Sequence, residues 1–433
     1  MKYLPLGLCL FLMSCFIGPV EDIYEQVEDT YFPEAHLITP NDLGIIKPSV
    51  SLDLLWKANI GNHNGADFSL VVFDEFFVAA SSDGTIKKYE IFTGKVIWEK
   101  NIGTNISVGI GGNSETLLIV SDDGYLWCLD KSGVPRWKLF LNGEVFVSPI
   151  IYNSKIFVRI GNYEILGIDI KEGVIQWRYN KPAPPLTLKK TSQLVLANDV
   201  LYAGFPAGKL IAIHADSGGY LWESNVSKIK GVTEIERLNE VISKPVVNEG
   251  TIYAVSTNGS ISSIDRRNGR LIWTRDLPSN KNIEFNGYDI FVTHKSGSVY
   301  SLDKNNGDTN WRLNDLQYRR ITSGAIVGDY FIEGDFDGFV HVIDSESGLI
   351  VGRSQIVSGV KILDTLTVIE DKYVLAMSGE GEVFLIKFDE ITQTSLDDIS
   401  LSVSEEEILE TEVEAITDVR EIDKADELDR IYE

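Results

Sequence analysis

One pattern recurs along most of this chain, at intervals of roughly forty residues. Each copy holds a small-residue turn, a short β-type stretch, usually an Asp, then a Gly turn and a Trp, as in Asp123-Gly124, Asp130, Ser132-Gly133 and Trp137. Six copies carry the Trp, at Trp98, Trp137, Trp177, Trp222, Trp273 and Trp311. A seventh has Gly352 at that position, and an eighth keeps only Glu380-Gly381 and its strand. A constant period of this length predicts a repeat architecture.

Residues alternate between apolar and polar within each copy, as in Ser298–Asp303, and the runs lie between Gly turns. This period of two is typical of β-strands. Four strands in roughly forty residues make one propeller blade, and radial repetition leaves only short, protected sheet edges. We therefore predict an all-β fold, an eight-bladed β-propeller of four-stranded blades.

The eighth copy lacks an outer strand, whereas Ser51–Lys57, upstream of the first copy, has a strand pattern and contains Trp56. We predict that this N-terminal strand completes the last blade, which closes the ring and removes an open edge. Within the ring, each Trp is expected to cover small residues of the next blade, and the Gly residues supply the positive φ of tight turns.

The first residues read as an export signal. Met1-Lys2 precedes an apolar stretch, Tyr3 to Met13, that is too short to span a bilayer. Leu12-Met13-Ser14-Cys15 resembles the bacterial lipobox, which implies cleavage before Cys15 and lipidation of its thiol. Phe16 is not the Asp that retains lipoproteins in the inner membrane, so the resemblance implies the outer membrane. An ordinary secretory signal and an uncleaved anchor are the alternatives.

The predicted organisation is a lipoprotein signal peptide at 1–14, a lipidated Cys with a flexible tether at 15–49, the propeller at 50–390, and an acidic tail at 391–433. Residues 397–433 hold fifteen acidic and three basic residues, and self-repulsion predicts a largely disordered tail.

The net charge of −25 excludes nucleic acid as a partner, because phosphate binding requires concentrated Lys and Arg. Cys128 remains as a lone thiol in an apolar strand, which indicates a core residue.

The ring motif resembles the repeat of the quinoprotein dehydrogenases, so a pyrroloquinoline quinone enzyme must be considered. Those enzymes carry an adjacent Cys pair, which the mature chain cannot supply. The five His residues lack metal-ligand spacing, and neither a nucleophile elbow nor a phosphate loop is present. We predict no cofactor, no metal and no enzymatic activity. A dehydrogenase-like protein and a periplasmic ligand-binding propeller remain the alternatives.

Two connections exceed the length that the repeat requires. Successive Trp residues from Trp98 to Trp311 are 39, 40, 45, 51 and 38 residues apart. The extra length lies in residues 179–190, called here the first insertion, and in residues 227–245, called the second insertion. Because loops longer than the architectural minimum usually carry function, we expect a protein-binding surface there.

Both insertions also resemble a known family. The first matches a Leu-x-Leu-Arg element at Leu186, Leu188 and Lys189, and the second matches a Thr-Glu-Ile-acid-Arg-Leu segment at Thr233–Leu238. A third match, Asp315–Ser323, contains Arg319 and leads into a Gly-Asp-x-x-Gly turn. Over about residues 1–390 the chain resembles the BamB family, lipoproteins of the outer-membrane β-barrel assembly (BAM) machinery.

This resemblance implies a scaffold without chemistry, anchored at the periplasmic face of the outer membrane. In the family, the two insertions contact the periplasmic POTRA domains of BamA, the barrel-inserting subunit. Other BAM subunits are implied partners, and unfolded outer-membrane proteins are a secondary one. By this resemblance, Leu186 and Leu188 are expected to be apolar anchors of the contact with BamA, and Lys189 is expected to supply a cation to it. Glu240 takes the place of an acidic contact residue, and Ile242 that of a frequent second Asp.

Each of these positions also has a structural interpretation. Leu186 and Leu188 can instead fasten their loop to the ring. Glu234 and Arg237 are three residues apart and are expected to organise the loop by pairing, or to bind the partner; Arg319 has the same two roles. Lys in place of Arg loses the bidentate fork and Ile in place of Asp removes a charge, so the polar half of the contact is expected to be rewired.

Overall fold

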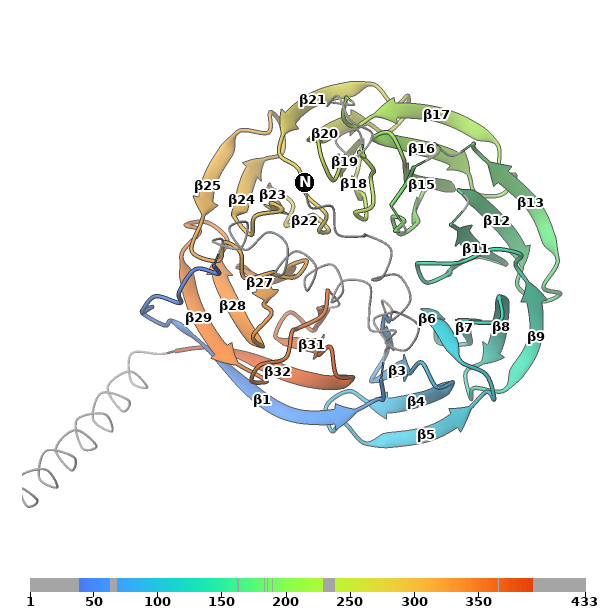
Figure 1. The fold of residues 1–433 in the computed structure, drawn as a ribbon, viewed down its shortest axis with the longest axis horizontal. Coiled ribbons are helices and arrows are strands. Elements are labelled where there is room, and N and C mark those ends of the chain that lie inside the picture. The colour runs from blue at the N-terminus through green and yellow to red at the C-terminus, as the bar shows by residue number, and fades with distance from the viewer. Residues whose placement is uncertain are drawn as a thin grey trace, which may run out of the picture.

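The computed structural model describes residues 39–391, except for 63–67, 162, 183, 185, 189, 229–237 and 365. Within these residues, thirty-two strands form eight four-stranded antiparallel sheets, arranged as blades around a central axis (Figure 1). The prediction of an all-β, eight-bladed propeller is confirmed. None of the described segments is a helix with the length and apolar character needed to cross a bilayer.

Blades are numbered in chain order and their strands from the axis outward. Blades 1 to 4 consist of β2 (Val71–Phe73), β3 (Phe76–Ala80), β4 (Thr85–Glu90) and β5 (Val96–Asn101); β6 (Ile106–Gly112), β7 (Thr116–Ser121), β8 (Tyr125–Asp130) and β9 (Pro135–Phe140); β10 (Ile150–Tyr152), β11 (Lys155–Ile160), β12 (Glu164–Asp169) and β13 (Ile175–Asn180); and β14 (Val195–Ala197), β15 (Val200–Phe205), β16 (Lys209–His214) and β17 (Tyr220–Asn225).

Blades 5 to 8 follow the same order, and the last takes its outer strand from the start of the ring. They consist of β18 (Val246–Asn248), β19 (Thr251–Val255), β20 (Ser260–Asp265) and β21 (Leu271–Asp276); β22 (Glu284–Phe285), β23 (Asp289–Thr293), β24 (Val299–Asp303) and β25 (Thr309–Leu313); β26 (Ala325–Val327), β27 (Tyr330–Gly334), β28 (Phe339–Asp344) and β29 (Ile350–Gln355); and β30 (Thr367–Ile369), β31 (Tyr373–Met377), β32 (Glu382–Glu390) and β1 (Val50–Asn59).

The ring closes through β1, the outer strand of blade 8. It pairs antiparallel with β32 from Val50 opposite Glu390 to Asn59 opposite Glu382. One irregularity interrupts the register between Leu54 and Trp56. The predicted closure by the N-terminal strand is confirmed, and it gives β32 a partner along its whole length.

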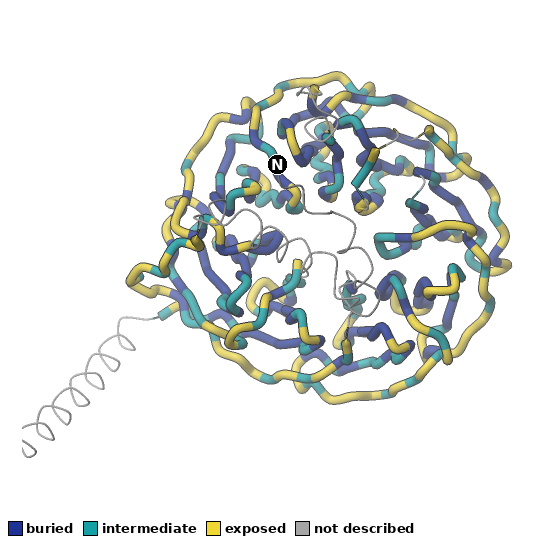
Figure 2. The backbone as a smooth tube through the Cα atoms, viewed as in Figure 1, coloured by how far each residue is buried: buried dark blue, intermediate teal, exposed yellow. Residues whose placement is uncertain are grey.

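The apolar core lies between neighbouring blades and repeats around the ring, with buried middle strands, half-buried innermost strands and an exposed outer rim (Figure 2). Between blades 2 and 3, for example, Leu118 of β7 packs in one cluster with Ile156 of β11 and Ile168 of β12. Cys128 is buried in the same cluster, as predicted, and burial raises the pKa of its thiol to about 11. Serial small cores let a chain of this length fold as one ring.

The outer Trp residues join neighbouring blades. Trp177 of β13 lies over the Gly turn of blade 4, where a Cβ on Gly218 would come within 2.5 Å of the indole. Its indole N–H also donates to Ala215 O at 3.1 Å. Gly218 has φ of +69°, so both the turn and the close approach require glycine. The predicted covering of small residues in the next blade by Trp is confirmed.

Gly352, which stands where a Trp is due, follows from the same geometry. Blade 8 has no hairpin between its two outer strands, because its outer strand β1 comes from the N-terminal side of the ring. Blade 8 therefore has no Gly turn for a Trp of blade 7 to cover. The start of β1 fills that place instead: a Cβ on Gly352 would lie 2.7 Å from Val50 O. Ser49 N–H donates to Val351 O at 2.8 Å beside it.

Both insertions lie on one face of the ring. Antiparallel order within a blade puts the turn between its two middle strands on the same face as the connection to the next blade. The first insertion connects β13 to β14, and the second connects β17 to β18. The segment from β25 to β26, which contains Arg319, lies on this face as well. We call it the insertion face.

Candidate partner-binding surface

The two insertions meet on the insertion face. The backbone N–H of Leu188, in the first insertion, donates to Oε1 of Glu240, in the second, at 2.5 Å. The hydroxyl of Tyr163, from the turn of blade 3, donates to Glu240 Oε2 at 3.4 Å. One carboxylate therefore joins the turn of blade 3 to both insertions.

The residues expected to contact a partner differ in accessibility. Leu186 is 44% exposed, whereas Leu188 and Ile242 are half-buried. Glu240 is only 3% exposed, so the residue expected as an acidic contact has its side chain beneath the loops. Lys189, Glu234 and Arg237 lie outside the described residues, as do the expected lipid attachment at Cys15, the signal peptide and nearly all of the acidic tail. Leu186 is thus the expected contact residue with the most accessible side chain.

The backbone of Glu240 is fixed on both sides. It forms an isolated bridge with Pro206, in the turn of blade 4. On the side of blade 5, Thr257 N–H donates to Glu240 O at 2.9 Å, and Glu240 N–H donates to Thr257 Oγ1 at 3.1 Å. At Glu240 the second insertion is thereby held between blades 4 and 5. From this position the Glu240 side chain extends toward blade 3.

Burial dominates the electrostatics of Glu240. It raises the pKa of this carboxyl to about 7, against the opposing effects of the Leu188 N–H, the Tyr163 hydroxyl and the charge of Arg159. Arg159, in β11, is 1% exposed, and its Nη1 donates to Ser192 O at 3.3 Å and to Ser192 Oγ at 2.8 Å. Nη2 donates to Gly204 O. A buried cation therefore holds the chain just beyond the first insertion.

Sequence reasoning missed both Arg159 and Tyr163, although each leaves a signal. Arg159 is the one charged residue within the apolar run Ile156–Ile160. Tyr163 stands in a turn where most other copies have Gly, and its φ of +67° is unfavourable for a bulky side chain. Strain of this kind persists where surrounding contacts require it and is common at functional sites.

An ion-pair cluster holds the start of the first insertion. Glu223 of β17 lies between the ammonium groups of Lys181 and Lys209 and accepts a hydrogen bond from each. Burial opposes ionisation of Glu223, but the two lysines hold its pKa below the ordinary value. The connection from β13 to β14 is therefore fastened at Lys181, at Leu188 and at Ser192.

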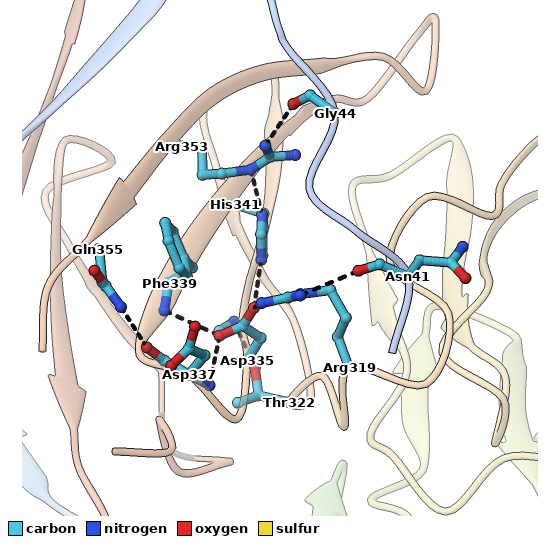
Figure 3. A network of polar contacts seen from close by, with 11 residues as sticks. Asn41, Gly44, Arg319, Thr322, Asp335, Asp337, Phe339, His341, Arg353 and Gln355 are labelled. Carbon is cyan, nitrogen blue, oxygen red and sulfur yellow. Dashed lines mark hydrogen bonds and ion pairs between the residues drawn. The ribbon is translucent and has the colours of Figure 1, made fainter. Parts of the chain in front are cut away.

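Arg319 belongs to a buried polar network on the other side of the ring (Figure 3). Its Nε and Nη2 lie 2.8 and 2.7 Å from Asp335 Oδ2, and its side chain is almost fully buried. His341 Nε2 lies 3.1 Å from the same oxygen, and the ring Nδ1 accepts a hydrogen bond from Arg353. Burial works against ionisation of Asp335, but the bonds from His341 and Arg319 hold its pKa below the ordinary value.

This network also fastens the segment before β1. Arg319 Nη1 donates to Asn41 O at 3.1 Å, and Arg353 Nη1 donates to Gly44 O at 2.9 Å (Figure 3). Leu43 and Ile46 pack against the apolar cluster of blades 6 and 7. Within the flexible tether expected up to residue 49, residues 41–46 are therefore held against the ring by hydrogen bonds and by two half-buried apolar side chains. Of the two roles expected for Arg319, these contacts support that of organising its loop.

The sequence of the ring matches a known family. A family model described as outer membrane protein assembly factor BamB covers residues 82–313, more than half of the chain. The chain belongs to the BamB family. A BamB from Nitrosomonas eutropha is 30% identical over 378 residues, which cover 87% of this chain and 90% of that protein. A BamB from Bordetella pertussis is 27% identical over 349 residues, covering 80% and 90%.

Solved structures share the fold. BamB from Moraxella catarrhalis superposes with a TM-score of 0.71 at 24% identity, over 78% of this chain and 99% of that one. Quinohemoprotein alcohol dehydrogenase from Comamonas testosteroni gives a TM-score of 0.63 at 13% identity, over 78% and 76%. At these identities the likeness concerns the propeller alone. Among the described residues, no group of three or more His, Cys, Asp or Glu side chains is placed to hold a metal ion.

Proposed function

We propose that this chain is a non-enzymatic scaffold subunit of the outer-membrane β-barrel assembly complex. Its insertion face binds the periplasmic POTRA domains of the cognate BamA, and the complex assists the assembly and insertion of β-barrel proteins. Membership of the BamB family, whose curated relatives are named outer membrane protein assembly factors, supports this role. Lipidation at Cys15 anchors the subunit to the periplasmic face of the outer membrane.

The observation that carries the proposal is the junction of the two insertions. The Leu188–Glu240 hydrogen bond brings together loops that are 52 residues apart, and Leu186 lies exposed beside this junction. An accessible Leu on a fastened loop offers apolar surface to a partner, and little ordering entropy is lost on binding. Ile242, half-buried in the second insertion, extends the apolar surface, and Lys189 supplies the cation.

A dehydrogenase is the less well supported function. The three cysteines, at positions 9, 15 and 128, include no adjacent pair. Cys128 is buried among apolar side chains, and the raised pKa of its thiol disfavours the reactive thiolate. The relatives with the higher identity are assembly factors, whereas the dehydrogenase shares only the propeller.

Binding of the soluble form, from Phe16 onward, to the periplasmic region of the cognate BamA tests the proposal. Leu186→Asp puts a charge at the expected anchor and should weaken binding about 30-fold, the equivalent of a 2 kcal/mol anchor. Leu349→Asp is the matched control: Leu349 is 65% exposed and lies in a turn on the opposite face. It should bind as the wild type does.

Circular dichroism and thermal unfolding must show that both variants remain folded. A wild-type protein that does not bind the periplasmic region of BamA contradicts the proposed function. Equal loss of affinity in both variants contradicts the assignment of the insertion face.

A further inference from the structure

The buried carboxylate of Glu240 accepts hydrogen bonds from within the protein, whereas an acidic contact residue would direct its oxygens at the partner. Its two oxygens accept hydrogen bonds from the Leu188 backbone and the Tyr163 hydroxyl, while its own backbone is wedged between blades 4 and 5. With 3% of the residue exposed, little of its surface is left for a partner. Both oxygens of this carboxylate therefore face the protein, and one of them accepts from the loop that carries Leu186.

The far end of the same loop is held in the same manner. Ser192 is fully buried, and its Oγ accepts hydrogen bonds from Arg159 Nη1 and from Gly204 N–H, both at 2.8 Å. Leu188 and Ser192 are therefore held by two buried side chains, Glu240 from the second insertion and Arg159 from blade 3. The charge of Arg159 favours the ionised form of Glu240.

We infer that Glu240 is a positioning residue, which sets the first insertion in its partner-binding conformation by accepting the Leu188 N–H, and that Arg159 does the same through Ser192. This inference rests on the proposed function for its partner. It predicts that removal of Glu240 weakens binding because Leu186 and Leu188 are displaced, and that the negative charge of Glu240 is dispensable while its acceptor atom is not.

Two substitutions separate the acceptor from the charge. Glu240→Gln keeps an oxygen for the Leu188 N–H and removes the charge, whereas Glu240→Met fills a similar volume and accepts nothing. A contact residue that uses its charge would lose binding equally in both. Glu333→Met is the control, because Glu333 is a fully buried acid in blade 7, away from both insertions.

The experiment measures hydrogen exchange at the Leu188 amide and affinity for the periplasmic region of BamA in the same variants. Glu240→Met should speed Leu188 exchange and weaken binding, each by about tenfold or more, as expected when a buried hydrogen bond to a carboxylate is lost. Glu240→Gln should stay within about threefold of wild type in both, by the same arithmetic. Glu333→Met should change neither. If Glu240→Met does not fold, Ser192→Ala removes the hydroxyl that accepts from Arg159 and Gly204 at the other end of the loop, and its affinity for BamA shows whether the position of the loop matters for binding.

Two results would overturn the inference. If Glu240→Gln loses as much affinity as Glu240→Met while Leu188 stays protected, Glu240 contacts the partner through its charge. If Glu240→Met exposes the Leu188 amide and leaves affinity unchanged, the position of the loop does not matter for binding. A wild-type protein that fails to bind contradicts the proposed function, whereas the exchange rates still show whether Glu240 fixes the loop.

Discussion

Replacing Asp335 by Asn should destabilise the ring more than any change of one exposed charge. The carboxylate is fully buried and accepts two hydrogen bonds from Arg319 and one from His341 at Oδ2, and two from backbone N–H groups at Oδ1. An Asn whose oxygen serves the backbone turns its NH2 group toward Arg319 and His341. Donors then face donors, and the buried guanidinium loses its counter-charge.

Breaking a buried ion pair in this way costs about 3–5 kcal/mol. Urea denaturation of the soluble form, followed by Trp fluorescence, measures the change in free energy of unfolding. Asp337→Asn removes the same charge two residues away, where the structure gives the carboxylate no buried cation, and should cost less than about 1 kcal/mol. Adding Arg319→Met to Asp335→Asn should recover part of the loss, since the unpaired cation is then gone.

The pH dependence gives an independent check. Because the pKa of Asp335 is held below its ordinary value of 3.8 in the folded state, its contribution is present above that pH and is lost as the pH falls through the folded-state value. The difference between wild type and Asp335→Asn should therefore shrink in acid. A loss at neutral pH no larger than that of Asp337→Asn would refute the reasoning.

Three further predictions concern the ring. Gly352→Trp, which restores the repeat, should destabilise the protein by about 1–3 kcal/mol in urea denaturation, because Val50 O occupies the space. Trp177→Ala should cost about 3–5 kcal/mol in the same assay, through lost packing on Gly218. Burial raises the pKa of Glu333 to about 8, so the folded state binds this proton more tightly and stability should fall from about pH 5 to about pH 8, by up to about 1.4 kcal/mol per pH unit. Glu333→Gln should remove that slope in denaturation series across this range.

Parts of the candidate site were readable from spacing alone. The Trp intervals located both insertions, since any length beyond one blade must leave the ring as a loop. The same intervals could not show that Leu188 and Glu240 share a hydrogen bond, because that contact depends on how two loops fold over three blades. Nor could they show that Glu240 points inward, since an acidic residue in a loop usually faces solvent.

Arg319 illustrates the same limit. Its segment was found through a family resemblance that left two roles open, and neither role follows from local pattern. The contact with Asp335 spans only 16 residues but follows no repeat, and the contact with Asn41, which lies 278 residues earlier, exists only once the ring has closed. A residue that bonds to a neighbouring turn and to a segment near the start of the ring carries no periodic signal.

The sequence by itself determined the number of blades, the closing strand and the Trp and Gly pairs, because these arise from short-range alternation and turn chemistry repeated at a constant period. The tertiary structure alone decided why Gly352 replaces a Trp, which way Glu240 faces and how residues 39–49 are held. Each of these depends on residues that are distant in the chain and are brought together on the ring. For the buried charges, desolvation also makes the choice of hydrogen-bond partner energetically decisive.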